Sequence, residues 1–393
     1  MKAKRICLKN YNCICVHKMK ISDSFSVQIK NVNVYFFPYD IFQSIVNPDD
    51  FVNLKEMVVC DSVAVIEACF HNSLEVQLIK SAISMAYFSN RIAISEKSEK
   101  NMEERKNQEI ENFLKQLQID KKEKKYNEIK NKMKEKDADL TSYFQNYMLN
   151  GFWNQSGAEA RIEPTFWYVK LGQTAPTNDD YDMWLSRIYG TNQQDAFLKR
   201  DGLEKRDKLL GTVEIDEPFC NVLHKIQERI HQKDLYASKL LSVFSIYYSV
   251  LRNFSNSEQE CISFCTILET LLLGKDEDKQ RKKVSVRAAC LIADGEKFEK
   301  KRFLATQIYM FYPYRNGFVH DGKSILDFDW GSYQILYQAI KHVIYYCIKN
   351  ILYRNIQCKK EITAIVEKNA KQDGLENAFN YIDENINYLN YNE

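Results

Sequence analysis

The sequence has few Gly and Pro, and its Cys lack the spacing of a structural metal site. Only 12 Gly and 6 Pro occur among its 393 residues, and the 11 Cys form an odd set without a Cys-x-x-Cys pair. The spacings Cys13/Cys15 and Cys261/Cys265 do not suit a structural zinc site, so we expect reduced, buried thiols. Polar residues interrupt the start of the chain, at Lys9 for example, and no signal peptide is predicted.

Long uninterrupted apolar runs are lacking as well. Residues 333–352 are about long enough to cross a bilayer, but Lys341, His342 and Lys349 interrupt them, which is typical of a half-buried helix. We therefore expect a cytoplasmic protein with no membrane partner.

An excess of charge of one sign is also missing. The 55 Lys and Arg nearly balance the 53 Asp and Glu, which leaves a formal net charge of +2. A protein held to nucleic acid by its overall field would be more basic, so any RNA site must be a local patch. The six His include no His-x-x-x-His pair beside an acidic ligand set, so we expect neither a catalytic metal nor a cofactor.

The remaining composition is that of a globular protein, with 45% hydrophobic and 13% aromatic residues. At this length we expect two domains, residues 1–216 and 217–393, in an α+β protein. Residues 5–70 contain short β-rich runs, at 25–29, 34–37 and 63–66, and predict a mixed α/β opening. Residues 76–94 fit neither the helical nor the strand period.

Residues 97–147 alternate acids and bases and predict a charged helical arm. Within it, Ile110, Phe113, Leu114 and Leu117 have the spacing of one apolar helix stripe. The Lys-rich run at 121–125 would suit an RNA-binding or coiled-coil arm, but a solvated helix face with ion pairs is the simpler interpretation.

Residues 150–216 group Trp153, Trp167 and Trp184 among loop-forming residues. Such aromatic anchors are more often small-domain core than a sensor pocket, and both interpretations stay open.

From Pro218 onward the pattern is helical and predicts an all-α bundle. After a first helix from about residue 218, we expect further helices at about 235–254, 257–273, 279–293, 300–312, 327–353 and 376–387. On two of these helices Glu269 and Arg287 lie at the edge of an apolar stripe. They could pair or share a polar cleft, and a structural ion pair is the more common outcome.

The segment 312–322 is the most informative in the chain. It places Tyr312, Arg315, Asn316 and His320 close together, and Gly322 can end a helix just beyond the His. An Arg and a His at this distance also arise by chance, as a surface Arg and a His at the negative end of a helix.

The order of these elements resembles an Apea-like HEPN domain over roughly residues 217–355. The resemblance rests on Leu268-Glu269 in one helix, Arg287-Ala288 in the next, and then Tyr-x-x-Arg-Asn-x-x-x-His with a nearby Gly. Two departures are Gly317, where a helix-favouring residue is more usual, and Asp321 between the His and the Gly; both could loosen the local helix.

The resemblance implies a metal-independent endoribonuclease that transesterifies cellular RNA, such as tRNA, as an antiviral-defence, abortive-infection or toxin effector. His320 would transfer protons, Arg315 would bind phosphate, and Asn316 would orient the phosphate or the His. Glu269 would position Arg315, and Arg287 and Tyr312 would support the site. One His cannot easily be both acid and base, so the resemblance also implies a homodimer.

The resemblance further implies that the amino-terminal domain is a sensing or regulatory unit that answers to a protein or nucleotide trigger. The main alternative is a non-catalytic HEPN module that binds RNA or a protein partner. A plain helical scaffold with an accidental Arg-His spacing is a second alternative.

Overall fold

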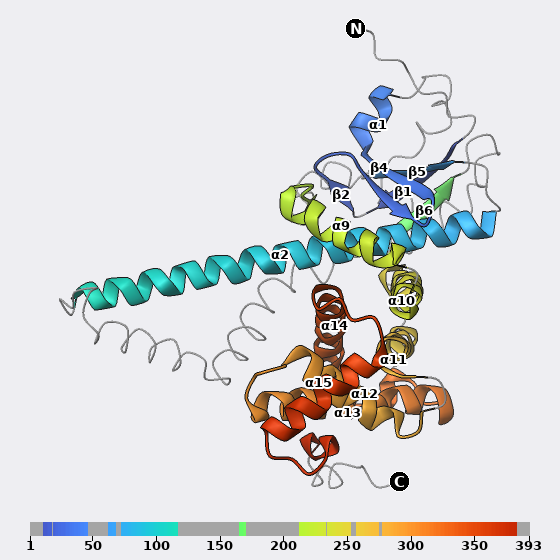
Figure 1. The fold of residues 1–393 in the computed structure, drawn as a ribbon. Helices are drawn as coiled ribbons and strands as arrows, with labels where there is room; N and C mark the ends of the chain where they lie inside the picture. Colours follow the sequence, from blue (N-terminus) through green and yellow to red (C-terminus); the bar gives the residue numbers. More distant parts are fainter. Residues whose placement is uncertain are drawn as a thin grey trace.

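The computed structural model describes residues 11–17, 19–45, 62–67, 72–116, 165–169, 212–232, 234–252, 257–274 and 277–382. Within these ranges a small sheet comes first and a helical region follows (Figure 1). The coarse α+β order predicted from the sequence is therefore confirmed.

The sheet is antiparallel throughout, with strand order β3-β4-β5-β1-β6. Its strands are β1 (Tyr11–His17), β3 (Phe25–Ile29), β4 (Val32–Pro38), β5 (Ser62–Glu67) and β6 (Thr165–Val169). In β3 the buried Val27 and Ile29 alternate with the exposed Ser26 and Gln28, because successive side chains point to opposite faces of a sheet. The strands predicted near 25–29, 34–37 and 63–66 are confirmed.

Short elements complete this part of the chain. Helix α1 (Tyr39–Ile45) follows β4, and β2 (Lys20–Ile21) pairs in parallel with β7 (Thr212–Val213). Of the three tryptophans in the segment 150–216, only Trp167 in β6, opposite Cys15, lies within the described residues. The predictions for Trp153 and Trp184 lie outside them.

Helix α2 (Asn72–Gln116) lies between the sheet and the helical region, and its carboxyl-terminal half extends beyond both (Figure 1). Residues 76–94, for which the sequence did not decide between helix and strand, are helical in α2. Ile79, Ile83, Met85, Phe88 and Ile92 are all buried, because strands pack on α2 from one side and helices from another. Of the predicted arm, residues 97–116 are helical, and residues 117–147 lie outside the described ranges.

The helical region starts at an Asp-Glu-Pro segment. Asp216 is the N-cap and accepts from the Phe219 amide at 3.0 Å, with Pro in the first turn, which is a favourable helix start. The elements are α9 (Glu217–His231), α10 (Leu235–Arg252), α11 (Ser257–Leu272), α12 (Gln280–Ile292), α13 (Phe298–His320), η4 (Ile325–Asp327), α14 (Trp330–Tyr353), α15 (Lys359–Gln372) and η5 (Ala378–Tyr381).

Three expectations about these helices need correction. Helix α13 runs eight residues beyond the predicted end at residue 312. Helix α15 was not predicted. In the segment expected to form a helix at 376–387, residues 378–381 form a 3-10 helix, and residues 383–387 lie outside the described ranges.

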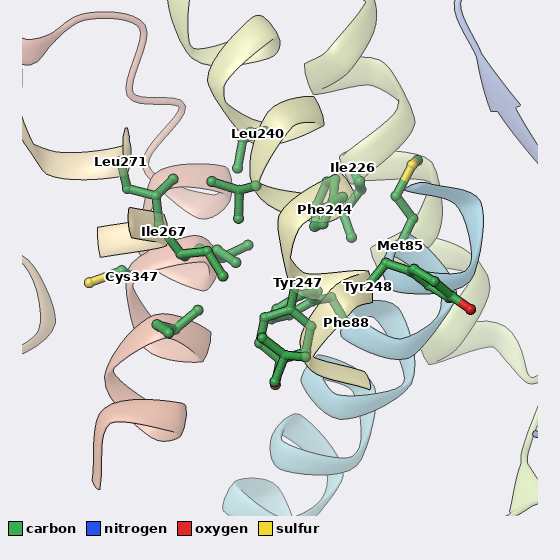
Figure 2. Packing of buried hydrophobic residues seen from close by; sticks show 14 of the residues in the cluster. Met85, Phe88, Ile226, Leu240, Phe244, Tyr247, Tyr248, Ile267, Leu271 and Cys347 are labelled. Atoms are coloured by element: carbon green, nitrogen blue, oxygen red, sulfur yellow. The ribbon is translucent and has the colours of Figure 1, made fainter. Parts of the chain in front are cut away.

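One continuous apolar core joins the sheet to the helices. Figure 2 shows Met85 and Phe88 of α2 beside Phe244 and Tyr247 of α10, and the same cluster extends to Ile267 of α11 and to α14. The Phe88 and Tyr247 rings are 4.7 Å apart, edge to face. The core therefore crosses the predicted domain boundary at 216/217.

None of the helices in the described ranges combines the length and apolarity needed to span a bilayer.

Candidate functional site

Helix α13 carries the Arg-Asn-x-x-x-His segment and remains helical through Pro313. Proline has no N–H, so the Tyr309 carbonyl one turn earlier loses its helical donor. Arg281 of α12 replaces that donor: its Nε donates to the Tyr309 oxygen at 2.7 Å, and its guanidinium lies 3.5 Å from the centre of the Tyr309 ring. The side chain of Arg281 thus allows α13 to continue to His320.

The end of α13 brings the three predicted catalytic residues together. Arg315 Nη1 lies 3.2 Å from His320 Nε2 and donates at 3.2 Å to Asn316 Oδ1. An arginine cannot accept a hydrogen bond, so in this arrangement Nε2 is the acceptor and the His320 ring carries its proton on Nδ1. Asn316 and His320 are exposed and Arg315 is half-buried, which leaves the group accessible to a ligand.

A glycine follows the end of the helix, as the sequence predicts, although the helix itself is longer than expected. His320 is the last residue of α13, and Gly322 adopts a φ of 64°, in the left-handed region that glycine tolerates best. The Lys323 amide then folds back to the Gly317 carbonyl at 3.0 Å. Asp321, between the His and the Gly, is the C-cap residue, and the helix is regular up to it.

Gly317 has a packing role that the sequence did not indicate. It is buried within α13, and a Cβ at this position would lie 2.5 Å from Cζ of Phe328. The Phe328 ring also packs on Tyr314 at 4.9 Å and on Phe318 at 5.3 Å. The expected loosening of the helix is therefore absent at this glycine, and its missing side chain lets the segment after α13 pack closely.

That segment is held from a second side by α11. Glu258, in the first turn of α11, accepts the Ile325 amide at 2.9 Å, and Ser324 and Asp327 form a reciprocal cap on η4. The surface beside His320 is thus built on a short, well-anchored turn. Leu326, at its tip, is 90% exposed.

Glu269 of α11 is half-buried, as its position at the edge of an apolar stripe predicted, and it lies near enough to Arg315 to interact with its charge. Burial raises the pKa of this carboxyl group, and the nearby Arg315 charge and Tyr312 hydroxyl act in the opposite direction. The Tyr312 hydroxyl is buried, and the Glu269 carboxyl group lies close to it. Burial, together with the neighbouring Cys265 and Glu269, raises the pKa of Tyr312.

Arg287 is engaged elsewhere. Its Nη1 donates to the Leu272 carbonyl at the end of α11 and lies 2.8 Å from the carboxylate of Glu277. Arg287 thus forms an ion pair with Glu277, and the pairing with Glu269 that the sequence suggested is not found among the described residues. Glu277 also pairs with Lys283 and Lys359, so Arg287 belongs to a network that fastens the end of α11.

The cysteines and acids offer no metal site in the described ranges: no group of three or more His, Cys, Asp or Glu side chains there is arranged to hold an ion. Cys261, Cys265, Cys290 and Cys347 are buried free thiols, as expected, whereas Cys220 is exposed and Cys358 is half-buried. The polar groups of the candidate site are the Arg315 guanidinium, the Asn316 amide and the His320 imidazole.

Sequence reasoning found the residues that present polar groups and missed those that support them. Arg281, Glu258 and Phe328 all contact the α13 segment from outside it. One signal was available: a proline inside a helical pattern needs a donor from another element for the carbonyl one turn earlier.

Comparison with protein-family models, with curated proteins and with solved structures finds no match for this chain.

Proposed function

We propose that the chain is a metal-independent endoribonuclease of the HEPN type, with Arg315, Asn316 and His320 as its catalytic group. The observation that carries the proposal is the 3.2 Å approach of Arg315 to His320 on an accessible helix end. The order of helices from α11 to α14, with the Glu269 carboxyl group near the Arg315 charge, supports the resemblance of the sequence to Apea-like HEPN domains.

The proposed chemistry is transesterification of RNA to a 2′,3′-cyclic phosphate and a 5′-hydroxyl. Arg315 binds two oxygens of the scissile phosphate and stabilises the charge of the phosphorane. As the guanidinium turns to the phosphate it leaves His320 Nε2, which is then free to take the 2′-hydroxyl proton. Binding of the phosphate and release of the base are thereby coupled through one side chain.

A second proton donor is needed for the leaving 5′-oxygen, because one imidazole cannot give and take a proton in the same step. A homodimer that places two such groups in one cleft supplies it. The proposed substrate is cellular RNA, tRNA among others, and the proposed role is antiviral defence or a toxin. The amino-terminal sheet and α2 form the proposed sensing unit, in a cytoplasmic protein.

The test is to incubate the full chain with total bacterial RNA in EDTA and to sequence the new ends. Wild type should produce fragments with cyclic phosphates, and His320→Ala should reduce cleavage by about 10²–10⁴-fold. His224→Ala is the matched control, because His224 is an exposed histidine that pairs with Glu228 on α9, a different helix from the site. Equal cleavage by wild type and His320→Ala would refute the assignment.

The alternative is a HEPN module that binds RNA or a protein without cutting. An Arg315 far from His320 would favour it, whereas the two side chains lie in contact. This alternative would be established if the wild type bound RNA without cleaving it and if Arg315→Ala weakened that binding.

A further inference from the structure

The turn that follows α13 carries a lysine beside the proposed catalytic group. The Lys323 amide donates to the Gly317 carbonyl at 3.0 Å, and Cδ of Lys323 lies 3.4 Å from the point that a Cβ of Gly317 would occupy. At about 100° per residue, His320 projects between Arg315 and Gly317 around the helix. The stem of Lys323 therefore lies across the last turn of α13, on the other side of His320 from Arg315.

This turn is held in place through its backbone. Glu258 accepts the Ile325 amide at 2.9 Å, and Ser324 and Asp327 cap η4 reciprocally. Both acids are thus directed at backbone amides. A side chain on an anchored turn loses less conformational freedom on binding a ligand than one on a loose loop. Lys323 is therefore presented from a fixed backbone position.

The Lys323 ammonium has two neighbours among the described residues. Its Nζ lies 5.9 Å from the centre of the Phe328 ring and 3.7 Å from Oδ2 of Asp321. The two side chains of this ion pair are 50% and 54% exposed, so water screens the pair and it contributes little to stability. An ammonium has three donors. Lys323 can therefore keep Asp321 and still donate to a phosphate oxygen.

Without the lysine, Asp321 would oppose the binding of RNA. Asp321 directly follows His320, where the proposed function requires the phosphates of an RNA strand to pass. A carboxylate repels phosphate, and the charge of Lys323 offsets that of Asp321. Arg315 supplies a second cation on the opposite side of His320. Cations on both sides of the imidazole suit a strand in which every nucleotide carries a negative charge.

We propose that Lys323 is a phosphate-binding residue that holds the RNA phosphate next to the one bound by Arg315. This inference rests on the proposed function, because it takes RNA as the ligand of the Arg315–His320 group. Lys323 acts at a phosphate that is not cleaved, so it stabilises the bound substrate and the transition state equally. The proton transfers remain with His320.

The experiment measures binding of a fluorescein-labelled RNA oligonucleotide of mixed sequence to the full chain, in EDTA, by fluorescence anisotropy at several salt concentrations. The parent protein and its variants all carry His320→Ala, which keeps the RNA intact. Lys323→Met retains the stem and removes the charge. It should weaken binding about tenfold at low salt and reduce the slope of log Kd against log salt by about 0.7, the value for one phosphate of a single strand.

Three further variants show whether the effect belongs to this charge. Lys323→Arg should bind as the parent does, with the same salt slope. Lys297→Met removes an exposed lysine at the opposite end of α13 and should also bind as the parent does. Asp321→Asn should tighten binding, because it removes a carboxylate that repels phosphate.

The proposal is overturned if Lys323→Met binds RNA as the parent does, or if the parent does not bind RNA. An equal loss in Lys323→Met and Lys297→Met also overturns it, because that is an effect of net charge alone.

Failure of the nuclease proposal is a separate result. The wild type would then bind RNA and leave it intact, and the effects of Lys323 on binding would remain. Where the wild type does cleave, Lys323→Met in a chain that keeps His320 should raise KM with kcat little changed. A fall in kcat with KM unchanged contradicts the inference.

Discussion

Arg281 donates to the Tyr309 carbonyl that Pro313 leaves without a helical partner. This contact predicts a specific coupling. Arg281→Leu should lower the free energy of unfolding by about 1–3 kcal/mol, because a helix carbonyl then loses a charge-assisted donor. Urea unfolding followed by circular dichroism measures the loss.

The double variant identifies the cause. In Pro313→Ala the helix regains its own N–H, so Arg281→Leu should cost less in that background than in wild type. An equal cost in both backgrounds would mean that Arg281 stabilises the protein only by packing on the Tyr309 ring.

Gly317→Ala should destabilise the protein, although alanine is the better helix former by about 1 kcal/mol. The added methyl group would lie 2.5 Å from the Phe328 ring, and such overpacking typically costs about 1–3 kcal/mol. With Phe328→Ala already present, the ring is gone and the same change should become stabilising. Thermal unfolding of the four proteins measures the change in stability caused by Gly317→Ala with and without the Phe328 ring. If Gly317→Ala still lowers stability without the ring, the explanation is wrong.

Glu269→Gln should change stability and activity in opposite directions. Burial raises the pKa of Glu269 in the folded state, so the folded protein favours the protonated carboxyl, and ionisation costs stability as the pH rises through that value. The neutral amide avoids this cost. The variant should therefore be more stable than wild type at pH 8, and the two should be similar at pH 4.

If Glu269 positions Arg315, the same variant should cleave RNA more slowly despite its stability. Cleavage rates at saturating RNA, measured beside the unfolding curves, separate the two effects. A variant that is less stable and also less active would point to a purely structural role.

The contribution of Glu277 to the stability of the fold should depend on pH in the opposite direction to that of Glu269. Its burial opposes ionisation, but Lys359, the Gly274 amide and Arg287 outweigh burial and hold its pKa at about 2. The stabilisation is complete above pH 4.5 and is lost as the pH falls toward 2. Glu277→Gln should therefore cost on the order of 3 kcal/mol at pH 7 and little at pH 2. Asp278→Asn, at an exposed neighbouring position, is the control and should change stability little.

The periodic elements could be predicted because each shows one face to solvent. The alternation in β3 and the apolar spacing of α9 each follow from a single buried face, and both were found. Residues 76–94 had no such pattern, because α2 buries Ile79, Ile83 and Phe88 against neighbours on different sides. Burial from more than one direction removes the period on which sequence reasoning depends.

The candidate site could likewise be predicted only in part. Arg315 and His320 are five residues apart in one segment, so the sequence showed them as neighbours along the chain, and α13 brings Arg315 Nη1 to 3.2 Å from His320 Nε2. The choice of Glu277 as the partner of Arg287 depends on the loop after α11, and no spacing between helices reveals it. The helix predicted at about 300–312 stops just before Pro313, whereas α13 continues through that proline, where Arg281, 32 residues earlier, donates to the Tyr309 carbonyl.

Helix α2 also sets how the chain can be divided. Its buried side chains belong to one cluster with buried residues of the sheet and of α10, and Figure 2 shows Met85 and Phe88 beside Phe244 and Tyr247 of α10. A fragment that begins at residue 217 would keep the Arg315–His320 group but would expose Phe244 and Tyr247 to water, an apolar surface that favours aggregation. A fragment intended for experiments in solution should therefore begin before residue 72. The amino-terminal half keeps apolar side chains of the helical region covered.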